Sequence, residues 1–207
     1  MHCRIKICGI TTLEDAKAAI ELGADALGFV FYPPSPRHIE LQTAAEISHQ
    51  LPPFITTTAL FVDSSRQQIK TILNTARIDC LQFHGNEHAK DCEGYNRPWI
   101  KAIRMKADID LIEQRQIYKN ASALLLDTYV KGIAGGTGEK FPWQLIPESL
   151  RSEIILAGGL TTENVCQAVK TVQPWAVDVS GGVEKEKGMK DHVKIAQFIK
   201  EVRAGES

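Results

Sequence analysis

The chain has 207 residues, of which 43% are hydrophobic and 24% are charged, a composition typical of one globular domain. Its 24 basic and 25 acidic residues nearly cancel, which leaves a net charge of −1. This balance gives no electrostatic footprint for nucleic acid or an anionic membrane, although it does not exclude a small anionic ligand.

The N-terminus and the cysteines indicate the compartment. Residues 1–4 lack the features of a secretory signal. No stretch approaches the roughly 18 apolar residues that span a bilayer. The five cysteines are odd in number and scattered, unlike a disulfide framework. We therefore expect a soluble cytoplasmic protein with reduced thiols.

Short apolar runs alternate with helical patterns along the chain. Several runs are nearly continuous, as expected for parallel strands covered on both faces. They begin at intervals of roughly 20–30 residues, the spacing of βα units. The expected strands are Arg4–Cys8, Ala26–Phe31, Thr56–Val62, Asp79–Phe83, Trp99–Ile103, Ala123–Asp127, Glu153–Ala157 and Ala176–Val179.

Helical patterns fill most of the gaps between these runs. Thr11 with Glu14 resembles a capping box at the start of the first helix, and Gly23 suits the position after its end. Apolar residues at i, i+3, i+4 and i+7 indicate further helices, while two expected helices look very short. The striped segments are 69–76, 165–172 and 195–202, and the short ones are Glu87–Cys92 and Pro142–Pro147.

The repeat predicts the fold class. Eight βα units without a break in composition indicate an α/β protein, a single-domain (β/α)8 TIM barrel over residues 1–207. The alternative is an open doubly wound sheet. Its usual dinucleotide fingerprint, G-x-G-x-x-G, is absent after every expected strand.

A thiol and a carboxyl end two of the expected strands. Cys8 ends the first and Asp127 ends the sixth. Strand ends converge on one mouth of such a barrel, so this pair predicts proton-transfer catalysis. Cys8 is followed by Gly9 close to a helix start, whose field favours a thiolate. The alternative for Cys8 is an inert buried cysteine.

Glycines follow the last two expected strands. Gly158 and Gly159 follow the seventh, while Ser180, Gly181 and Gly182 follow the eighth. Loops at these places commonly bind phosphate in barrels, with backbone N–H groups as donors. Either pair alone could be turn glycines. Together they predict a phosphate site.

A third glycine cluster follows Asp127. Gly135, Gly136, Thr137 and Gly138 lie in a long segment beside a candidate catalytic group. Such a segment is a candidate lid that excludes water from bound substrate. A disordered surface loop is the alternative.

Two further side chains follow expected strands. Arg37 lies in a loop stiffened by three prolines, Tyr32–His38, and its guanidinium suits a substrate carboxylate. A solvated surface arginine is the alternative. His84 ends the fourth strand and could contact substrate, although capping or structural hydrogen bonding is the more common role.

Four residues of the kinds that bind zinc are spaced four apart, namely Cys80, His84, His88 and Cys92. On a helix they would lie along one face and could bind a zinc ion together. Cys80 lies in an expected strand, however, and Gly85 would interrupt a helix. We therefore expect no metal site.

Taken in order, the segments resemble phosphoribosylanthranilate isomerase, the enzyme of tryptophan biosynthesis. Single pieces are weak signals, but the ordered set is specific and runs over nearly the whole chain. The segments are Lys-Ile-Cys-Gly-Ile-Thr at 6–11, Gly-Phe-Val-Phe at 28–31, Ser-Pro-Arg at 35–37, Gln-Phe-His-Gly at 82–85, Leu-Leu-Leu-Asp at 124–127, Gly-Gly-Thr-Gly at 135–138, Leu-Ala-Gly-Gly-Leu at 156–160 and Asp-Val-Ser-Gly-Gly-Val-Glu at 178–184.

The resemblance implies an Amadori rearrangement of N-(5-phosphoribosyl)anthranilate to 1-(2-carboxyphenylamino)-1-deoxyribulose 5-phosphate. It implies Asp127 as general acid and Cys8 as general base, with no metal or organic cofactor. The expected partner is a small phosphorylated substrate, while the choice between monomer and homodimer stays open. Two positions depart from the family pattern, Phe83 in place of leucine and Gly181 in place of a second serine.

Two rival functions remain. A related histidine-pathway isomerase would carry aspartate where this chain has Cys8. A non-catalytic sensor of phosphorylated ligands would tolerate the loss of Cys8 or Asp127, and both are present.

Overall fold

The computed structural model describes residues 2–106, 108–127, 143 and 146–206. Eight parallel strands form a closed barrel in chain order, and β1 pairs with β8 to close it. This arrangement confirms the predicted (β/α)8 fold, with each strand boundary within one residue of the expected one. The strands are β1 Arg4–Cys8, β2 Ala26–Val30, β3 Thr56–Phe61, β4 Cys80–Phe83, β5 Trp99–Arg104, β6 Ala123–Asp127, β7 Ile154–Ala157 and β8 Ala176–Val179.

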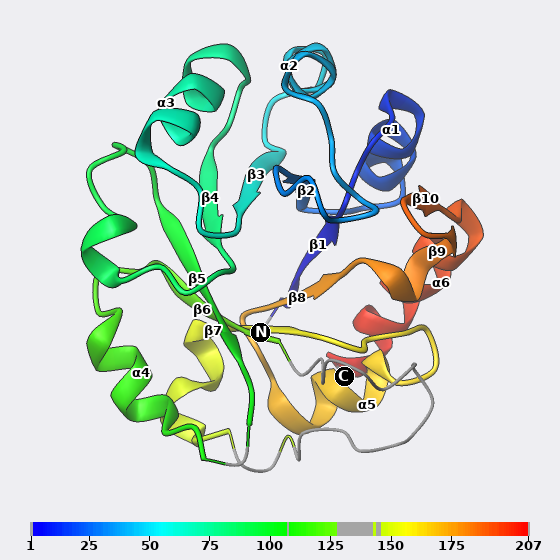
Figure 1. Cartoon of the computed structure of the whole chain (residues 1–207). Coiled ribbons are helices and arrows are strands. Elements are labelled where there is room, and N and C mark those ends of the chain that lie inside the picture. The colour runs from blue at the N-terminus through cyan, green and yellow to red at the C-terminus, as the bar shows by residue number, and fades with distance from the viewer. Residues whose placement is uncertain (1, 107, 128–142, 144–145, 207) are drawn as a thin grey trace.

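Helices cover the outside of the barrel (Figure 1). The connection after β4 contains only a single 3-10 turn, η1, as its short pattern predicted. The short helix expected at Pro142–Pro147 lies partly outside the described residues, and the helix described before β7, η3, is of the 3-10 type. The helices are α1 Leu13–Glu21, α2 Leu41–His49, α3 Arg66–Thr75, η1 Ala89–Asp91, α4 Leu111–Ile117, η3 Glu148–Glu153, α5 Val165–Val172, η4 Gly181–Val183 and α6 His192–Gly205.

The start of α1 differs from the prediction by one residue. Thr12 is the cap, because its side chain accepts from the Asp15 N–H at 3.1 Å. Thr11 instead donates its hydroxyl to the Gly188 carbonyl at 2.9 Å. Two threonines precede two acidic residues here, so the spacing alone fits either start. The predicted end is confirmed, since Gly23 follows the helix with a φ of +105°.

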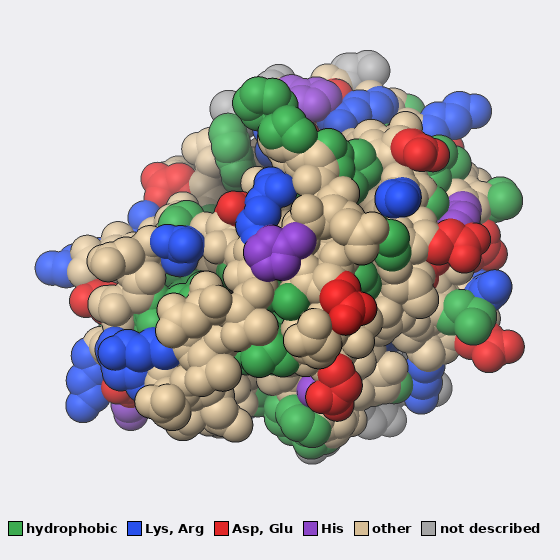
Figure 2. Space-filling view, turned by 90° about the horizontal axis from the view of Figure 1, so that it is seen from above, with side chains coloured by type: hydrophobic (Ala, Val, Ile, Leu, Met, Phe, Trp, Pro, Cys, Tyr) green, Lys and Arg blue, Asp and Glu red, His purple; other side chains and the backbone are tan. Residues whose placement is uncertain are grey.

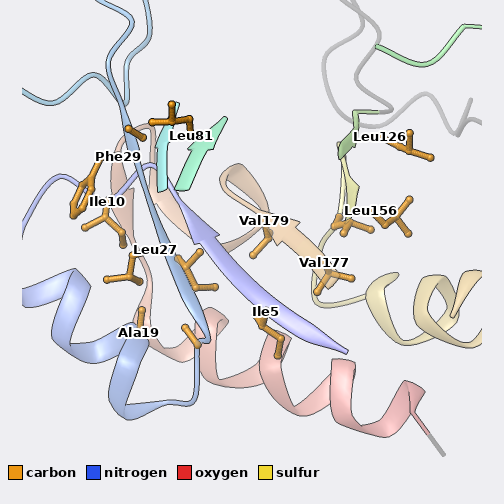
Figure 3. Close-up of a cluster of buried hydrophobic side chains, with 14 of the residues drawn as sticks. Ile5, Ile10, Ala19, Leu27, Phe29, Leu81, Leu126, Leu156, Val177 and Val179 are labelled. Atoms are coloured by element: carbon orange, nitrogen blue, oxygen red, sulfur yellow. The ribbon is translucent and has the colours of Figure 1, made fainter. Parts of the chain in front are cut away.

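Alternation along each strand divides the side chains between two cores. Ile5 and Ile7 join the large core between barrel and helices, and Figure 3 shows Ile5 pointing from β1 toward the helix layer. Lys6 and Cys8 therefore lie on the opposite, inward face of β1. The barrel interior is packed by a second cluster, which consists of Cys80, Ile100, Ala102, Ala123, Leu125, Ile155, Ala157 and Ala176.

Phe83 lies on the helix side of β4. Its ring centroid is 6.1 Å from those of Phe61, Tyr95 and Trp99. The inward neighbour on the strand is Gln82, which is fully buried. The departure at Phe83 from the family pattern is therefore a matter of packing outside the barrel.

A β-hairpin that the sequence did not predict follows η4. Its strands are β9 Glu184–Glu186 and β10 Met189–Lys190, paired antiparallel. They are too short and too charged to give an apolar pattern. The turn lies against the loop of Arg37, since a Cβ at Gly188 would be 2.6 Å from the Pro36 carbonyl oxygen. The hairpin thereby brings Glu184 and Lys190 beside the mouth.

The surface carries mixed charge. On the face seen in Figure 2, basic and acidic side chains are interspersed among hydrophobic and polar ones, without one sign gathering over a large area. Within the described ranges, every helix is too short or too polar to cross a membrane.

Candidate active site

Cys8 lies at the carboxyl end of β1, inside the mouth. Its residue is only 4% exposed and contacts Val30 and Leu60. Gly28 is its partner on β2, and a Cβ added at Gly28 would lie 2.8 Å from the Cys8 sulfur. The thiol therefore occupies space that only a glycine on the neighbouring strand leaves open.

Charged side chains act on this thiol. Burial raises the pKa of Cys8, the charge and hydrogen bond of Lys6 and the charge of Lys190 act to lower it, and Asp178 acts to raise it. The net pKa is above the ordinary value. α1 begins at Leu13, five residues after Cys8, and the effect of its field on the thiol stays a prediction.

Arg37 is fixed at the mouth by a carboxylate of the protein itself. Its Nε and Nη2 donate to the two carboxylate oxygens of Glu184, each at 2.7 Å. A Cβ at Gly9 would lie 2.8 Å from Arg37 Cδ and 3.0 Å from Ser180 Oγ. The guanidinium is thus held between the loops that follow β1 and β8, which contradicts the alternative of a solvated arginine.

Lys190 connects Glu184 with the loop after β8. Its fully buried Nζ lies 3.0 Å from a Glu184 carboxylate oxygen, 3.3 Å from the Ser180 carbonyl and 3.4 Å from the Ser180 hydroxyl. Burial lowers the pKa of Lys190, although the Glu184 carboxylate opposes this effect. Lys190 therefore stabilises both the partner of Arg37 and the backbone of a predicted phosphate loop.

The two predicted phosphate loops lie against each other. A Cβ at Gly182 would collide with the Leu160 carbonyl, so the loop after β8 packs closely on the loop after β7. Gly158 and Gly159 have φ values of +74° and +65°, which favour glycine. A Cβ at Gly159 would meet no described heavy atom within 4 Å, so this backbone borders open space.

Asn164 shapes the loop after β7. Its side chain donates to the Gly159 carbonyl at 2.8 Å and accepts from the Thr161 N–H at 2.9 Å. It also occupies the N-cap position of α5. This side chain therefore couples the glycine pair to the start of a helix.

Asp127 ends β6 beside His84. An Asp127 carboxylate oxygen lies 3.0 Å from His84 Nε2, and Gln82 Nε2 lies 3.1 Å from His84 Nδ1. When the amide of Gln82 donates to Nδ1, Nε2 carries the imidazole hydrogen and donates to Asp127. The structure thus gives His84 a contact with the carboxyl group that ends β6.

Other predicted features fall outside this arrangement. The candidate lid residues Gly135, Gly136, Thr137 and Gly138 lie outside the described residues. Within the described ranges, no three His, Cys, Asp or Glu side chains are grouped so that they could hold a metal ion. A separate hollow, bordered by Cys3, Arg151 and Glu206, lies at the opposite end of the strands and contains none of the predicted site residues.

Sequence reasoning missed the charged residues that support the site. Lys6 stands two positions before Cys8 in a strand, which places both on one face. Asp178 likewise stands two positions before Ser180. This two-residue spacing could have revealed Lys6 and Asp178. No comparable signal marked Glu184 or Lys190, because a short polar segment gives no sequence pattern that predicts a hairpin.

Comparison with known proteins settles the family. The family described as N-(5'-phosphoribosyl)anthranilate (PRA) isomerase matches residues 5–201. The chain belongs to this family. The predicted resemblance is therefore confirmed, and the match argues against the related histidine-pathway isomerase.

Relatives with this activity match along almost their full length. The N-(5'-phosphoribosyl)anthranilate isomerase of Pseudomonas fluorescens (strain Pf0-1) is 57% identical over 200 residues, covering 97% of this chain and 98% of the relative. That of Thiobacillus denitrificans (strain ATCC 25259 / T1) is 53% identical over 204 residues, with 99% and 100% covered. The chain is thus an isomerase of tryptophan biosynthesis, as its sequence predicted.

Solved structures show the same fold. Phosphoribosyl anthranilate isomerase from Thermotoga maritima superposes with a TM-score of 0.89 at 40% identity, covering 98% of this chain and 99% of that one. A second isomerase structure contains reduced 1-(o-carboxyphenylamino)-1-deoxyribulose 5-phosphate. It has a TM-score of 0.86 at 38% identity, with 98% and 99% covered.

Proposed function

We propose that this isomerase performs its Amadori rearrangement with Asp127 as general acid and Cys8 as general base. The observation that carries the proposal is their placement. Cys8 ends β1 beside Lys6, and Asp127 ends β6 beside His84, at the same mouth of a closed barrel. Groups at the carboxyl ends of different strands are the usual catalytic set of this fold.

The first step opens the ribose ring. Protonated Asp127 donates its proton to the ring oxygen while the anilino nitrogen lone pair forms a C=N bond, and the bond from C1 to the ring oxygen breaks. The product is an iminium with a free hydroxyl, and Asp127 becomes a carboxylate. The His84 Nε2 that lies 3.0 Å away can then donate to that carboxylate and hold it in place.

The second step moves a proton from C2. The Cys8 thiolate takes this proton, the C–H electrons form a C1=C2 double bond, and the iminium nitrogen becomes neutral. The enolamine then tautomerises to the ketone product. The proposed route uses proton transfers alone, and the cations around Cys8 compensate its negative charge before the transfer.

Two anchors would hold the substrate. Arg37 is proposed to bind the anthranilate carboxylate, because a guanidinium has five donors and Glu184 already fixes its plane. The adjoining loops are proposed to bind the phosphate through backbone N–H groups. Their glycines and serine are Gly158, Gly159, Ser180, Gly181 and Gly182.

Turnover of N-(5-phosphoribosyl)anthranilate, followed by the loss of its fluorescence, tests the proposal. General acid–base catalysis contributes about 10²–10⁴ in rate, so Asp127→Asn and Cys8→Ser should each lose at least about a hundredfold in kcat. Retained binding of a reduced product analogue would show that each site is intact. Activity within about tenfold of wild type, or 1.4 kcal/mol, would remove that residue from its role.

A further inference from the structure

A buried ion pair lies next to Cys8 inside the barrel. Lys6 Nζ is 2.8 Å from Asp178 Oδ1, and the two side chains are 5% and 9% exposed. Lys6 pairs in register with Asp178 across β1 and β8. Because Lys6 and Cys8 are two residues apart on one strand, both point to the interior. The ion pair therefore lies below the thiol, deeper in the barrel interior.

Gly28 brings the ammonium and the thiol together. The position that a Cβ would occupy at Gly28 is 2.8 Å from Cys8 Sγ and 3.0 Å from Lys6 Nζ. Both groups therefore converge on the space left by one missing side chain on β2. A larger residue at this position would have to displace them.

Two buried lysines act on the thiol. The charges of Lys6 and Lys190 favour its ionised form, whereas that of Asp178 opposes it. Each lysine is also paired with a carboxylate, Lys6 with Asp178 and Lys190 with Glu184. A thiolate at Cys8 would therefore share these ammonium groups with the two carboxylates.

We propose that Lys6 is a positioning residue that stabilises the thiolate form of Cys8, and that Asp178 limits this effect by sharing the Lys6 ammonium. The inference rests on the proposed role of Cys8 as the base. Lys190 contributes a second cation from β10 but is already bound to Glu184 and Ser180. Of the two lysines, Lys6 is the one whose charge favours the thiolate more.

Because Asp178 and Cys8 share the Lys6 ammonium, two variants should shift the pH at which Cys8 ionises in opposite directions. Lys6→Met removes the cation, so Cys8 should ionise at higher pH. Asp178→Asn removes the competing carboxylate, so Cys8 should ionise at lower pH. A loss of packing would not produce shifts of opposite sign.

Ultraviolet titration of the thiolate measures these shifts without a reagent. Subtracting the Cys8→Ser protein in each background isolates Cys8 from the other cysteines, including Cys80, which Lys6 also faces. We expect the Lys6→Met midpoint to rise by at least about one pH unit, or tenfold less thiolate below the midpoint. We expect the midpoint of Asp178→Asn to fall. Lys6→Arg keeps the positive charge, so its midpoint should stay close to that of the wild type.

Lys101→Met is the matched control. Lys101 Nζ lies 2.8 Å from a Glu87 carboxylate oxygen, with side chains 3% and 6% exposed, so the pair is as buried as that of Lys6. Lys101 is not among the charges that shift Cys8. Its loss should therefore destabilise the fold while leaving the Cys8 midpoint unchanged.

Distinct outcomes overturn distinct claims. An unchanged midpoint in Lys6→Met, or an equal shift in Lys101→Met, would refute the role of Lys6. If Lys6→Met does not fold, a midpoint in Asp178→Asn that stays or rises would refute it instead. The role of Cys8 as base is judged separately, by the turnover of Cys8→Ser.

Discussion

The Arg37 guanidinium is held in one plane by its two hydrogen bonds to Glu184. A lysine at this position keeps the charge but cannot match that planar fork. We expect Arg37→Lys to raise KM by about tenfold or more and to lower kcat, because the substrate is then bound in a poorer geometry.

An analogue without the anthranilate carboxylate is the control for this variant. It should lose little additional affinity when Arg37 becomes lysine. If substrate and analogue lose the same factor, then Arg37 does not recognise that carboxylate.

The raised pKa of Cys8 predicts the pH dependence of the rate. A general base acts only when deprotonated, so kcat/KM should rise with pH until the Cys8 pKa is passed. Lowering the pH should reduce the rate about tenfold per unit on this limb. The limb should be absent from the residual activity of Cys8→Ser, and its persistence there would assign it to another group.

At the level of single residues, the sequence predicted Cys8, Arg37 and Asp127 but not their partners. Position at the end of an apolar strand is a local signal. The partner of Arg37 is Glu184, which lies in a hairpin 147 residues further along the chain. Such a pairing depends on how the barrel closes, and one sequence does not show it.

The glycine loops allow a prediction at the level of elements. Gly159 borders open space, so a valine there would extend into the proposed phosphate position as well as strain the left-handed backbone. Gly159→Val should raise the inhibition constant for inorganic phosphate at least about tenfold and weaken substrate binding. Competition kinetics measure both effects.

Backbone strain requires a matched glycine. Gly94 also has a positive φ, of +82°, and a Cβ there would meet only the flexible guanidinium of Arg66. Gly94→Val should leave phosphate inhibition unchanged. Gly85 would be a poor choice, because a Cβ there would lie 2.5 Å from a carboxylate oxygen of Asp63. If Gly94→Val and Gly159→Val change the phosphate inhibition constant equally, the change comes from backbone strain and not from crowding of the phosphate.

The β9–β10 hairpin should contribute a pH-dependent part of the stability. Burial acts to raise the pKa of Glu184, but the bonds and charges of Arg37 and Lys190 hold it below the ordinary 4.5. A depressed carboxyl pKa stabilises the fold above pH 4.5, and this stability is lost as pH falls through the folded-state value.

Urea unfolding across this acidic range tests the hairpin. Glu184→Gln should be less stable than wild type near neutral pH, and the difference should shrink as the solution becomes acidic. Glu186→Gln, an exposed change on the same strand, should track wild type throughout. A constant deficit for Glu184→Gln would show that the ion pairs are not its source.

For the whole molecule, the rhythm of apolar runs sufficed to predict eight strands and their closure. Parallel strands covered on both faces leave continuous runs such as Ala123–Asp127, which a sequence displays plainly. The buried ion pair of Lys6 and Asp178 was not predicted. A lysine within an apolar run suggests an exposed position at the end of a strand, unless a buried partner for its charge is known. The short hairpin left no periodic signal at all.

The separation of core from mouth leads to a final prediction. Phe198 on α6 is fully buried in the core outside the barrel, where α6 packs on α5 and α1. Removing its ring should cost about 3–5 kcal/mol of unfolding free energy, because a cavity forms between helices and strands. The inward groups at the mouth lie on the other face of the sheet, so Phe198→Ala should keep kcat per folded molecule within about twofold of wild type. Denaturant unfolding combined with active-site titration checks both values. A fall in kcat per folded molecule as large as that of Cys8→Ser would mean that helix packing sets the catalytic geometry, and that the mouth is not independent of the core outside the barrel.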